Sequence, residues 1–217
     1  MFMFVGMLPI LLGSLSSCTP EQEEDDSHEA VDLGLSVKWA SCNVGANSPE
    51  DYGGYYRWGE IKEYNINSGE YKYFQSIELG DGTTVTSPEC WRNIVSNISG
   101  TSYDVAHVKW GRGWRMPTRD EVDELCEMCS WQWTSINGVN GYKVTGPNGN
   151  FIFLPAAGLK IDEDFYSHSG ELCCYWAATM HNEESLCIPN LYFDGGYHAI
   201  TSIFWTKGGH SIRPVKD

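Results

Sequence analysis

Two cysteines, Cys126 and Cys129, have the spacing of a redox motif or of paired ligands in a metal site. Redox pairs with this spacing are activated at the N-terminus of a helix, where the helix dipole stabilises the thiolate. This pair instead lies near the far end of a helix that the sequence predicts to begin at Thr118. Both thiols fall on the apolar face of that helix with Val122 and Leu125, so we expect a buried, structural pair. A zinc site would require more ligands than this motif supplies.

Aromatic and polar side chains gather around glycine turns late in the chain. They are Tyr192, Asp194, Tyr197, His198 and Trp205. Aromatic rings stack on the faces of sugars and of other ligands. We therefore take these five residues as the candidate ligand-binding site. The alternative is an ordinary hairpin with exposed aromatic side chains.

Motifs of the common catalytic classes are absent from the sequence. It has no Gly-x-Ser-x-Gly elbow, no His-Glu-x-x-His pair, no P-loop and no dinucleotide-binding glycine fingerprint. Glycosidase chemistry needs two carboxylates at a fixed separation, and the sequence does not show which of its 29 acidic residues would form such a pair. We therefore expect no enzymatic activity, no catalytic residue, no metal site and no cofactor.

The acidic composition disfavours nucleic acid as a partner. The formal net charge is −15, and the 14 lysines and arginines are scattered along the chain. Binding to a phosphate backbone depends on clustered basic residues, which this chain lacks. The eight cysteines are many for a cytosolic protein and ordinary for an exported one.

The start of the chain predicts a lipoprotein export signal. An apolar run of about 13 residues leads through small residues to Cys18, and a strongly acidic stretch follows. No lysine or arginine precedes the run, which departs from the usual export signal. A membrane-spanning helix needs about 20 apolar residues, so a cleaved signal is expected. We expect residues 1–17 to be the signal peptide, Cys18 to carry the lipid anchor, and residues 18–29 to form an acidic tether to the membrane.

The elements that position these residues begin with a strand and a helix. Residues Val31–Trp39 are apolar at every odd position, which predicts a strand with one buried face. The stretch Asn43–Asp104 is rich in turn residues and is expected to be mostly loop with short helical pieces. Thr118 and Glu121 then form a capping box at the start of the helix that carries the two cysteines.

The second half of the chain returns to the two-residue period of strands. We expect strands at Tyr142–Thr145, Phe151–Leu154, Cys174–Thr179, Leu191–Asp194, Tyr197–Ile203 and His210–Val215. Turn residues at Gly146–Asn150 and Asp194–Gly196 predict two hairpins. A helix followed by many antiparallel strands indicates a single α+β domain, which would span residues 30–217.

Five blocks carry a resemblance to a known family. They are residues 31–40 (VDLGLSVKWA), 52–60 (YGGYYRWGE), 110–118 (WGRGWRMPT), 151–158 (FIFLPAAG) and 211–215 (SIRPV). In these blocks the chain resembles the Fibrobacter succinogenes major paralogous domain, and the match covers nearly the whole mature chain. That family is common in lipoproteins of gut and oral Bacteroidota and is related to C-type-lectin-like and formylglycine-generating-enzyme-like domains. The resemblance implies a C-type-lectin-like fold in which the first and last strands pair, and it brings no catalytic residue.

The resemblance also raises calcium-dependent sugar binding, which in C-type lectins uses a Glu-Pro-Asn or Gln-Pro-Asp loop followed by Trp-Asn-Asp. The nearest segment here, residues 188–190, reads Ile-Pro-Asn and lacks the carboxylate, and no Trp-Asn-Asp occurs. Asp162, Glu163 and Asp164 could supply oxygen ligands for calcium, although solvated loop charge is the plainer interpretation. We expect calcium-independent behaviour.

Together these features predict a lipid-anchored outer-membrane protein that faces outward and binds an extracellular glycan, peptide or protein without covalent chemistry. The acidic run after Cys18 resembles the surface-export signals of Bacteroidota lipoproteins. One alternative is a structural or interaction subunit of an envelope assembly. Another is an enzyme of the formylglycine-generating class, for which Cys187 is the only late candidate and has no matching local motif. With Cys18 lipidated, seven cysteines remain, and an odd number leaves at least one unpaired within the chain.

Overall fold

The described residues form antiparallel sheets and two short helices. The computed structural model describes residues 28–64, 77–78, 84–85, 96–111, 113–160, 166–179, 188–203 and 208–217. The helices are α1 (Val105–Trp110) and α2 (Arg119–Met128). The strands are β1 (Ala30–Val31), β2 (Lys38–Ala40), β3 (Ile77–Glu78), β4 (Thr84–Val85), β5 (Ser130–Ile136), β6 (Val139–Thr145), β7 (Phe151–Pro155), β8 (Leu159–Lys160), β9 (Tyr166–Ser167), β10 (Leu172–Trp176), β11 (Ile188–Asp194), β12 (Tyr197–Ile203) and β13 (Val215–Lys216).

The sheets are small, and every pair of neighbouring strands in them is antiparallel. Three sheets have three strands, in the orders β1-β2-β13, β5-β6-β7 and β10-β11-β12, and two have two strands, β3-β4 and β8-β9. Helices beside antiparallel sheets make an α+β arrangement, as the sequence predicted. The pairing of β2 with β13, in which Trp39 lies opposite Val215, confirms that strands from the two ends of the chain are neighbours.

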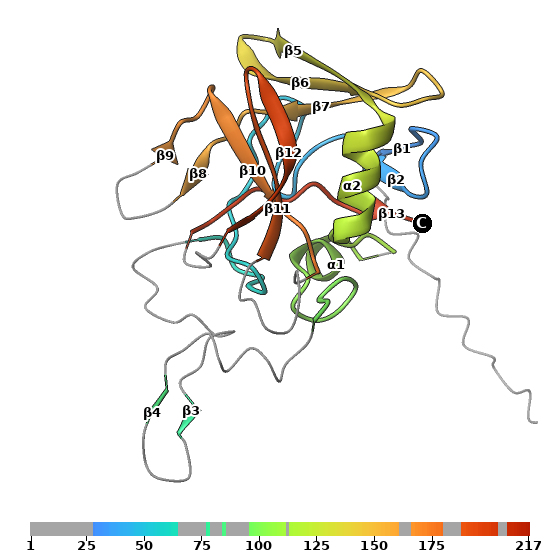
Figure 1. The fold of residues 1–217 in the computed structure, drawn as a ribbon. Coiled ribbons are helices and arrows are strands. Elements are labelled where there is room, and N and C mark those ends of the chain that lie inside the picture. The colour runs from blue at the N-terminus through green and yellow to red at the C-terminus, as the bar shows by residue number, and fades with distance from the viewer. Residues whose placement is uncertain are drawn as a thin grey trace, which may run out of the picture.

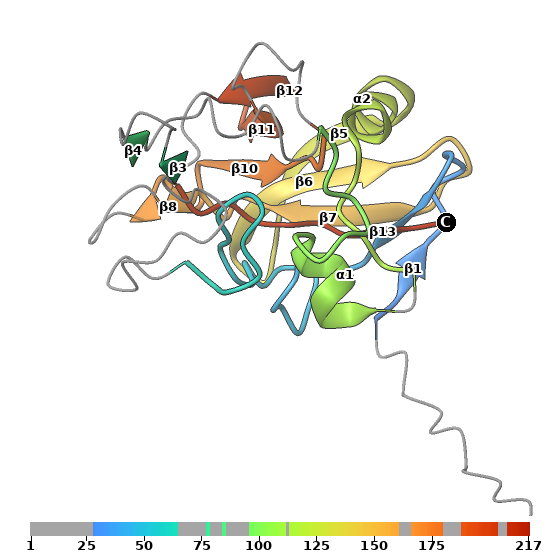
Figure 2. The ribbon, with the colours of Figure 1, turned by 90° about the horizontal axis from the view of Figure 1, so that it is seen from below.

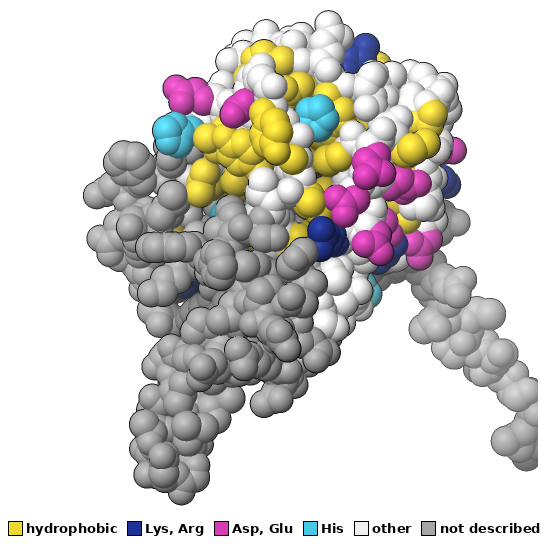
Figure 3. Space-filling view, viewed as in Figure 1, with side chains coloured by type: hydrophobic (Ala, Val, Ile, Leu, Met, Phe, Trp, Pro, Cys, Tyr) yellow, Lys and Arg dark blue, Asp and Glu magenta, His cyan; other side chains and the backbone are white. Residues whose placement is uncertain are grey.

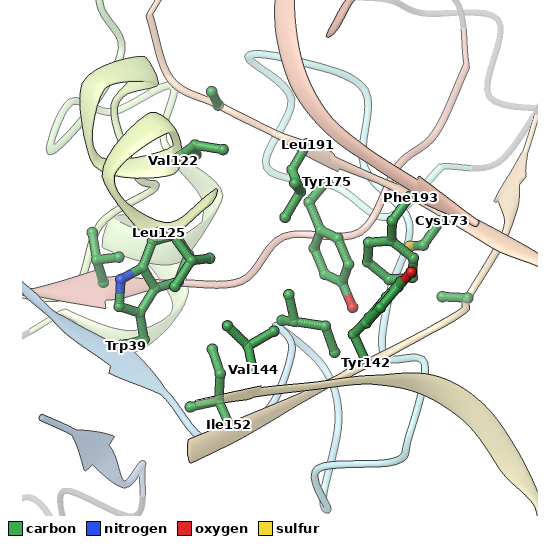
Figure 4. Packing of buried hydrophobic residues seen from close by; sticks show 14 of the residues in the cluster. Trp39, Val122, Leu125, Tyr142, Val144, Ile152, Cys173, Tyr175, Leu191 and Phe193 are labelled. Atoms are coloured by element: carbon green, nitrogen blue, oxygen red, sulfur yellow. The ribbon is translucent and has the colours of Figure 1, made fainter. Parts of the chain in front are cut away.

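The main hydrophobic core lies between the β5-β6-β7 sheet, the β10-β11-β12 sheet and α2 (Figures 1 and 4). Tyr142 of β6 meets Phe193 of β11 edge to face, with ring centroids 5.4 Å apart. Val122 and Leu125 close the core from α2, and both are buried. The inner side of the β11-β12 hairpin is therefore fixed by packing against the rest of the domain.

The helix α2 begins where the capping box predicted. Thr118 is its N-cap, the Glu121 backbone N–H donates to the Thr118 hydroxyl, and the Glu121 carboxylate accepts the Thr118 N–H at 2.7 Å. Arg115 donates two hydrogen bonds to the same carboxylate, at 2.9 and 2.6 Å. Glu121 therefore joins the start of α2 to the segment before it.

The predicted strand over Val31–Trp39 is wrong, because a turn divides it into β1 and β2, which pair with each other. Gly34 has φ of 77°, a conformation that favours glycine, and its N–H donates to the Asp32 carboxylate at 2.7 Å. Leu33 and Val37 are still buried, because the turn directs both inward. The alternating pattern identified the buried residues and missed the bend between them.

The strand β5 was not predicted at all. It pairs with β6 along its full length through a two-residue turn at Asn137 and Gly138. Both turn residues have positive φ, 50° and 84°, as a tight hairpin with the right-handed strand twist requires. The Asn-Gly dipeptide was the available signal for this hairpin.

Three other predictions differ from the structure, two of them in strand boundaries. The strand expected at Cys174–Thr179 is β10, which starts two residues earlier and ends at Trp176. The strand expected at His210–Val215 is reduced to β13, preceded by isolated bridges at His210 and Ser211. Within the described part of Asn43–Asp104 there are only the short strands β3 and β4 and isolated bridges, without the expected helical pieces.

A buried arginine joins segments that are far apart in the sequence. Arg213 is 1% exposed, and its guanidinium donates to the Asn43 side chain at 2.9 Å, to the Ala40 carbonyl at 3.0 Å and to the Phe153 carbonyl at 2.9 Å. Asn43 in turn donates to the hydroxyl of Tyr175 at 3.2 Å. Burial lowers the pKa of Arg213, yet a guanidinium stays charged in proteins, so these neutral acceptors are what satisfies the buried cation.

Arg213→Met should destabilise the protein by about 3 kcal/mol, because it leaves three buried acceptors without their donor. The matched control is Lys38→Met, which removes an exposed cation from β2 and should change stability by less than about 0.5 kcal/mol. Urea unfolding followed by tryptophan fluorescence measures both. Equal stability of Arg213→Met and the wild type would contradict this account of the network.

A second buried cluster, between α1 and β10, contains a neutral histidine. His210 stacks on Trp176 with ring centroids 3.8 Å apart, and its backbone N–H and carbonyl each bond to Tyr56 at 2.9 Å. The Nδ1 atom of His210 is buried and has no hydrogen-bond partner within the described part of the chain. Burial lowers the pKa of His210 to about 3, so the ring is uncharged at neutral pH.

Replacing His210 with phenylalanine, which keeps a ring for Trp176, should remove one source of acid sensitivity. The folded-state pKa of His210 is about 3 and the unfolded value is 6.5, so the unfolded chain takes up the proton first as the pH falls. Between these values the wild type should lose about 1.4 kcal/mol per pH unit more than His210→Phe. Urea unfolding of both proteins at several pH values in this window measures the difference. Parallel stability curves would contradict a buried neutral histidine.

Candidate functional site

The hairpin of β11 and β12 carries four of the five residues predicted to bind a ligand. Asp194 pairs with Tyr197 across a turn formed by Gly195 and Gly196. One Asp194 carboxylate oxygen accepts the Gly196 N–H at 2.9 Å, and the other accepts the Tyr192 hydroxyl at 3.1 Å. Asp194 therefore holds both the turn and a neighbouring tyrosine in place.

The register of the hairpin divides the predicted residues between two faces. Side chains alternate along a strand, and paired residues share a face. Tyr192, Asp194 and Tyr197 therefore lie on one side, which we call the outer hairpin face. His198 pairs with Phe193 and points to the opposite side, toward the main core.

The outer hairpin face presents two tyrosine rings and a carboxylate. The rings of Tyr192 and Tyr197 have centroids 6.4 Å apart and are inclined by 45°. Tyr197 is 54% exposed, whereas Tyr192 is partly buried. The Gly196 N–H lowers the pKa of Asp194, so this carboxylate is ionised at neutral pH. Burial, together with the hydrogen bond to Asp194, raises the pKa of Tyr192, which remains a neutral donor.

His198 belongs instead to an aromatic cluster on the inner side. Its ring stacks on Trp131 with centroids 4.2 Å apart and an interplanar angle of 13°. Trp131 and Trp133 both meet Tyr142 edge to face, at 5.4 and 5.1 Å. Burial lowers the pKa of His198, which favours the neutral ring in this stack. His198 therefore anchors the hairpin against β5.

Trp131 and Trp133 were missed by the sequence analysis. They occupy alternate positions of β5 and so share the face that packs under the hairpin. The indole of Trp133 lies close to Gly195, where an added Cβ would stand 3.5 Å from the ring. Recognising the Asn-Gly turn after β5 would have placed both tryptophans on one strand.

On the surface, hydrophobic side chains gather over the β10-β11-β12 sheet, and acidic side chains gather over α2 (Figure 3). The acidic side chains belong to the exposed side of an amphipathic helix and are typical of a solvated face. Exposed aromatic groups on a fixed hairpin are the more unusual feature. The arrangement can stack on a ligand and accept its hydrogen bonds, and it contains no nucleophile with an adjacent base.

Cys126 and Cys129 lie at the C-terminal end of α2, as predicted, and Cys129 is the C-cap residue. Both thiols are free and lie on the side of α2 that packs against the main core, but they are only partly buried, less than the expected buried pair. Burial raises the pKa of Cys126 to about 12 and that of Cys129 to about 11. These thiols are poor nucleophiles at neutral pH, in contrast to the activated pair of a redox enzyme.

The remaining residues considered for calcium binding, catalysis or ligand binding either have a structural role or lie outside the described residues. Asn190, in the segment nearest to a calcium-binding loop, is buried in β11 and its side-chain oxygen accepts a hydrogen bond from Thr201 at 3.0 Å. In the described ranges no group of three histidine, cysteine or acidic side chains could hold a metal ion. Trp205, Cys187 and residues 162–164 lie outside the described residues.

The predicted signal peptide at residues 1–17 and the predicted lipidation site Cys18 also lie outside the described part of the chain, which begins at His28, within the predicted tether. Neither described helix is long and apolar enough to cross a membrane. His28 stacks on Trp110 of α1, with ring centroids 3.6 Å apart. The last part of the predicted tether therefore lies beside α1.

Comparison of the chain with protein-family models, with characterised proteins and with solved structures finds no match. The functional assignment therefore rests on the geometry of the outer hairpin face and on the sequence.

Proposed function

We propose that this protein is a lipid-anchored cell-envelope protein, facing outward, that binds an extracellular glycan, peptide or protein without covalent chemistry. The binding site is the outer hairpin face formed by Tyr192, Asp194 and Tyr197. The observation that carries the proposal is the exposed ring of Tyr197, held beside Tyr192 on a turn that Asp194 fixes.

The chemistry of this face suits recognition. Tyrosine supplies a large contact area at a low cost in conformational entropy, because it has only two side-chain torsions. Its ring stacks on the apolar face of a sugar or on a planar side chain. Asp194 already accepts two hydrogen bonds, yet a carboxylate has about four acceptor positions, so it can accept further donors from a ligand. A preformed face of this kind loses little entropy on binding.

The position of the hairpin relative to the tether supports outward presentation. Figure 2 shows β1 and α1 on one side of the molecule and β11 and β12 on the opposite side. His28, at the end of the tether, is held against α1. A lipid on Cys18 would therefore leave the outer hairpin face directed away from the membrane.

We also propose that the fold is C-type-lectin-like. Its support is the α+β arrangement, the pairing of β2 with β13 at the two ends of the described chain, and the resemblance of the family blocks. In such folds the late loops often form the binding face. The β11-β12 hairpin is a late element of this kind, which is consistent with the proposed site.

The test is a binding screen of the chain from Ser27 onward against panels of glycans and host-matrix proteins, with and without a chelator. We expect binding that resists the chelator. Tyr197→Ala should then weaken the affinity roughly tenfold or more, because it removes the most exposed ring of the site. Titration by surface plasmon resonance or calorimetry measures the loss.

The matched control is Tyr103→Ala, which removes a tyrosine that is 39% exposed and precedes α1 on the other side of the domain. It should leave the affinity unchanged. Unchanged binding by Tyr197→Ala and Tyr192→Ala would place the site elsewhere. A screen without any binding would favour the subunit of an envelope assembly, which cross-linking on cells would then detect.

A further inference from the structure

The C-terminal end of α2 is held weakly by its own sequence. Its last turn contains no basic residue, although cations there would interact favourably with the negative end of the helix dipole. Glu127 adds negative charge at that end instead. The C-cap, Cys129, is extended, with φ of −102° and ψ of 155°, and no glycine follows it to complete a capping motif. Trp131 donates to the Leu125 carbonyl, but at 3.4 Å.

The spacing of the two cysteines along the helix brings their Cα atoms within the range of a disulfide. Residues three apart in an α-helix have Cα atoms about 5 Å apart, because the chain rises about 1.5 Å per residue over most of a turn. Disulfides bridge Cα atoms about 4.4 to 6.8 Å apart. In a regular helix the Cβ atoms are about 1 Å farther apart than a disulfide allows, so the bond requires a small adjustment at Cys129, the C-cap, where the regular helix ends. Both side chains also pack on the same side of α2, against the main core.

We propose that Cys126 and Cys129 are a modification site that forms an intramolecular disulfide, which fastens the last turn of α2 to the residue that leads into β5. The oxidant is a small-molecule disulfide or an enzyme disulfide. One cysteine thiolate attacks a sulfur of that disulfide, forms a mixed disulfide and releases one thiol. The second cysteine thiolate then attacks the protein sulfur of the mixed disulfide and releases the other thiol. The two cysteines lose two electrons and two protons, and the oxidant gains them.

The environment of the thiols makes this a lasting structural bond. Burial raises the pKa of both thiols, to about 12 for Cys126 and about 11 for Cys129. Thiols with a high pKa are poor leaving groups, so the finished disulfide is slow to be reduced. A catalytic pair shows the reverse pattern, because its reduced form is stabilised as a thiolate.

Other cysteines of the described residues serve as internal controls. Cys173 and Cys174 are buried, and as consecutive residues of β10 they point to opposite faces of the sheet. They should stay inaccessible to an alkylating reagent while the protein is folded. Their protection in the same sample shows that the fold was intact during the reaction.

The experiment treats the full-length purified protein, under native conditions at mildly alkaline pH, with oxidised glutathione, and then alkylates it before digestion with trypsin. The peptide Asp120–Lys143 contains Cys126 and Cys129 and no other cysteine. It should appear without alkyl groups and lighter than the dithiol by two hydrogen atoms. After reduction it should take up two alkyl groups. Thermal unfolding should occur roughly 4 °C or more higher in the oxidised than in the reduced protein.

The variants separate a disulfide from other oxidation. Cys129→Ser should leave Cys126 as a stable mixed disulfide with glutathione, and Cys126→Ser should do the same at Cys129. In the double variant Cys126→Ser/Cys129→Ser, treatment with oxidised glutathione should not raise the temperature of thermal unfolding. Alkylation of both cysteines in the glutathione-treated wild type, or mixed disulfides that persist there at both positions, would overturn the proposal. These outcomes do not depend on whether the outer hairpin face binds a ligand.

Discussion

The buried guanidinium of Arg213 is the constraint on which the arrangement of this domain depends. A cation in the interior is costly unless its donors are satisfied, and Arg213 satisfies them with the side chain of Asn43 and with two backbone carbonyls. Asn43 is 170 residues away in the chain, and Phe153 is 60 residues away. The fold brings acceptors from these distant segments together around one guanidinium. The arginine therefore fixes the last part of the chain against the first, next to the pairing of β2 with β13.

The hairpin of β11 and β12 is attached to the rest of the domain along its inner side. The core between the β5-β6-β7 and β10-β11-β12 sheets holds the inner side of β11 and β12 through Phe193, and the stack of His198 on Trp131 adds a second attachment to β5. What remains on the other side is a turn whose geometry Asp194 fixes and whose tyrosines are already oriented. Rigidity on one side thus produces a preformed surface on the other, which is the property a recognition site requires.

Local signals in the sequence predicted the local structure well. The capping box at Thr118 located the start of α2, and the turn residues at Gly146–Asn150 and Asp194–Gly196 located two hairpins. The alternating pattern before Trp39 identified buried residues but not the bend at Gly34, because the period of a strand carries no information about a glycine turn inside it. These elements depend on neighbours in the chain and can be inferred from them.

The relations between distant segments could not be inferred in the same way. Nothing in the residues around Arg213 shows that it is buried, since arginine is usually exposed and its acceptors lie in other parts of the chain. The arrangement of the candidate site could not be inferred from the sequence either. All five residues were chosen for their types, but the strand register separates His198 from Tyr192, Asp194 and Tyr197. Faces of a sheet follow from pairing, which a single sequence does not specify.

The most direct test of the outer hairpin face as the contact surface is site-specific photo-crosslinking on intact cells. A benzophenone amino acid would replace Tyr197 in one protein and Phe151, which is 48% exposed on β7, in another. We expect light-dependent adducts with extracellular glycan or protein from position 197 and none from position 151. Adducts from position 151 with none from position 197 would contradict the account and move the contact surface to the β5-β6-β7 sheet.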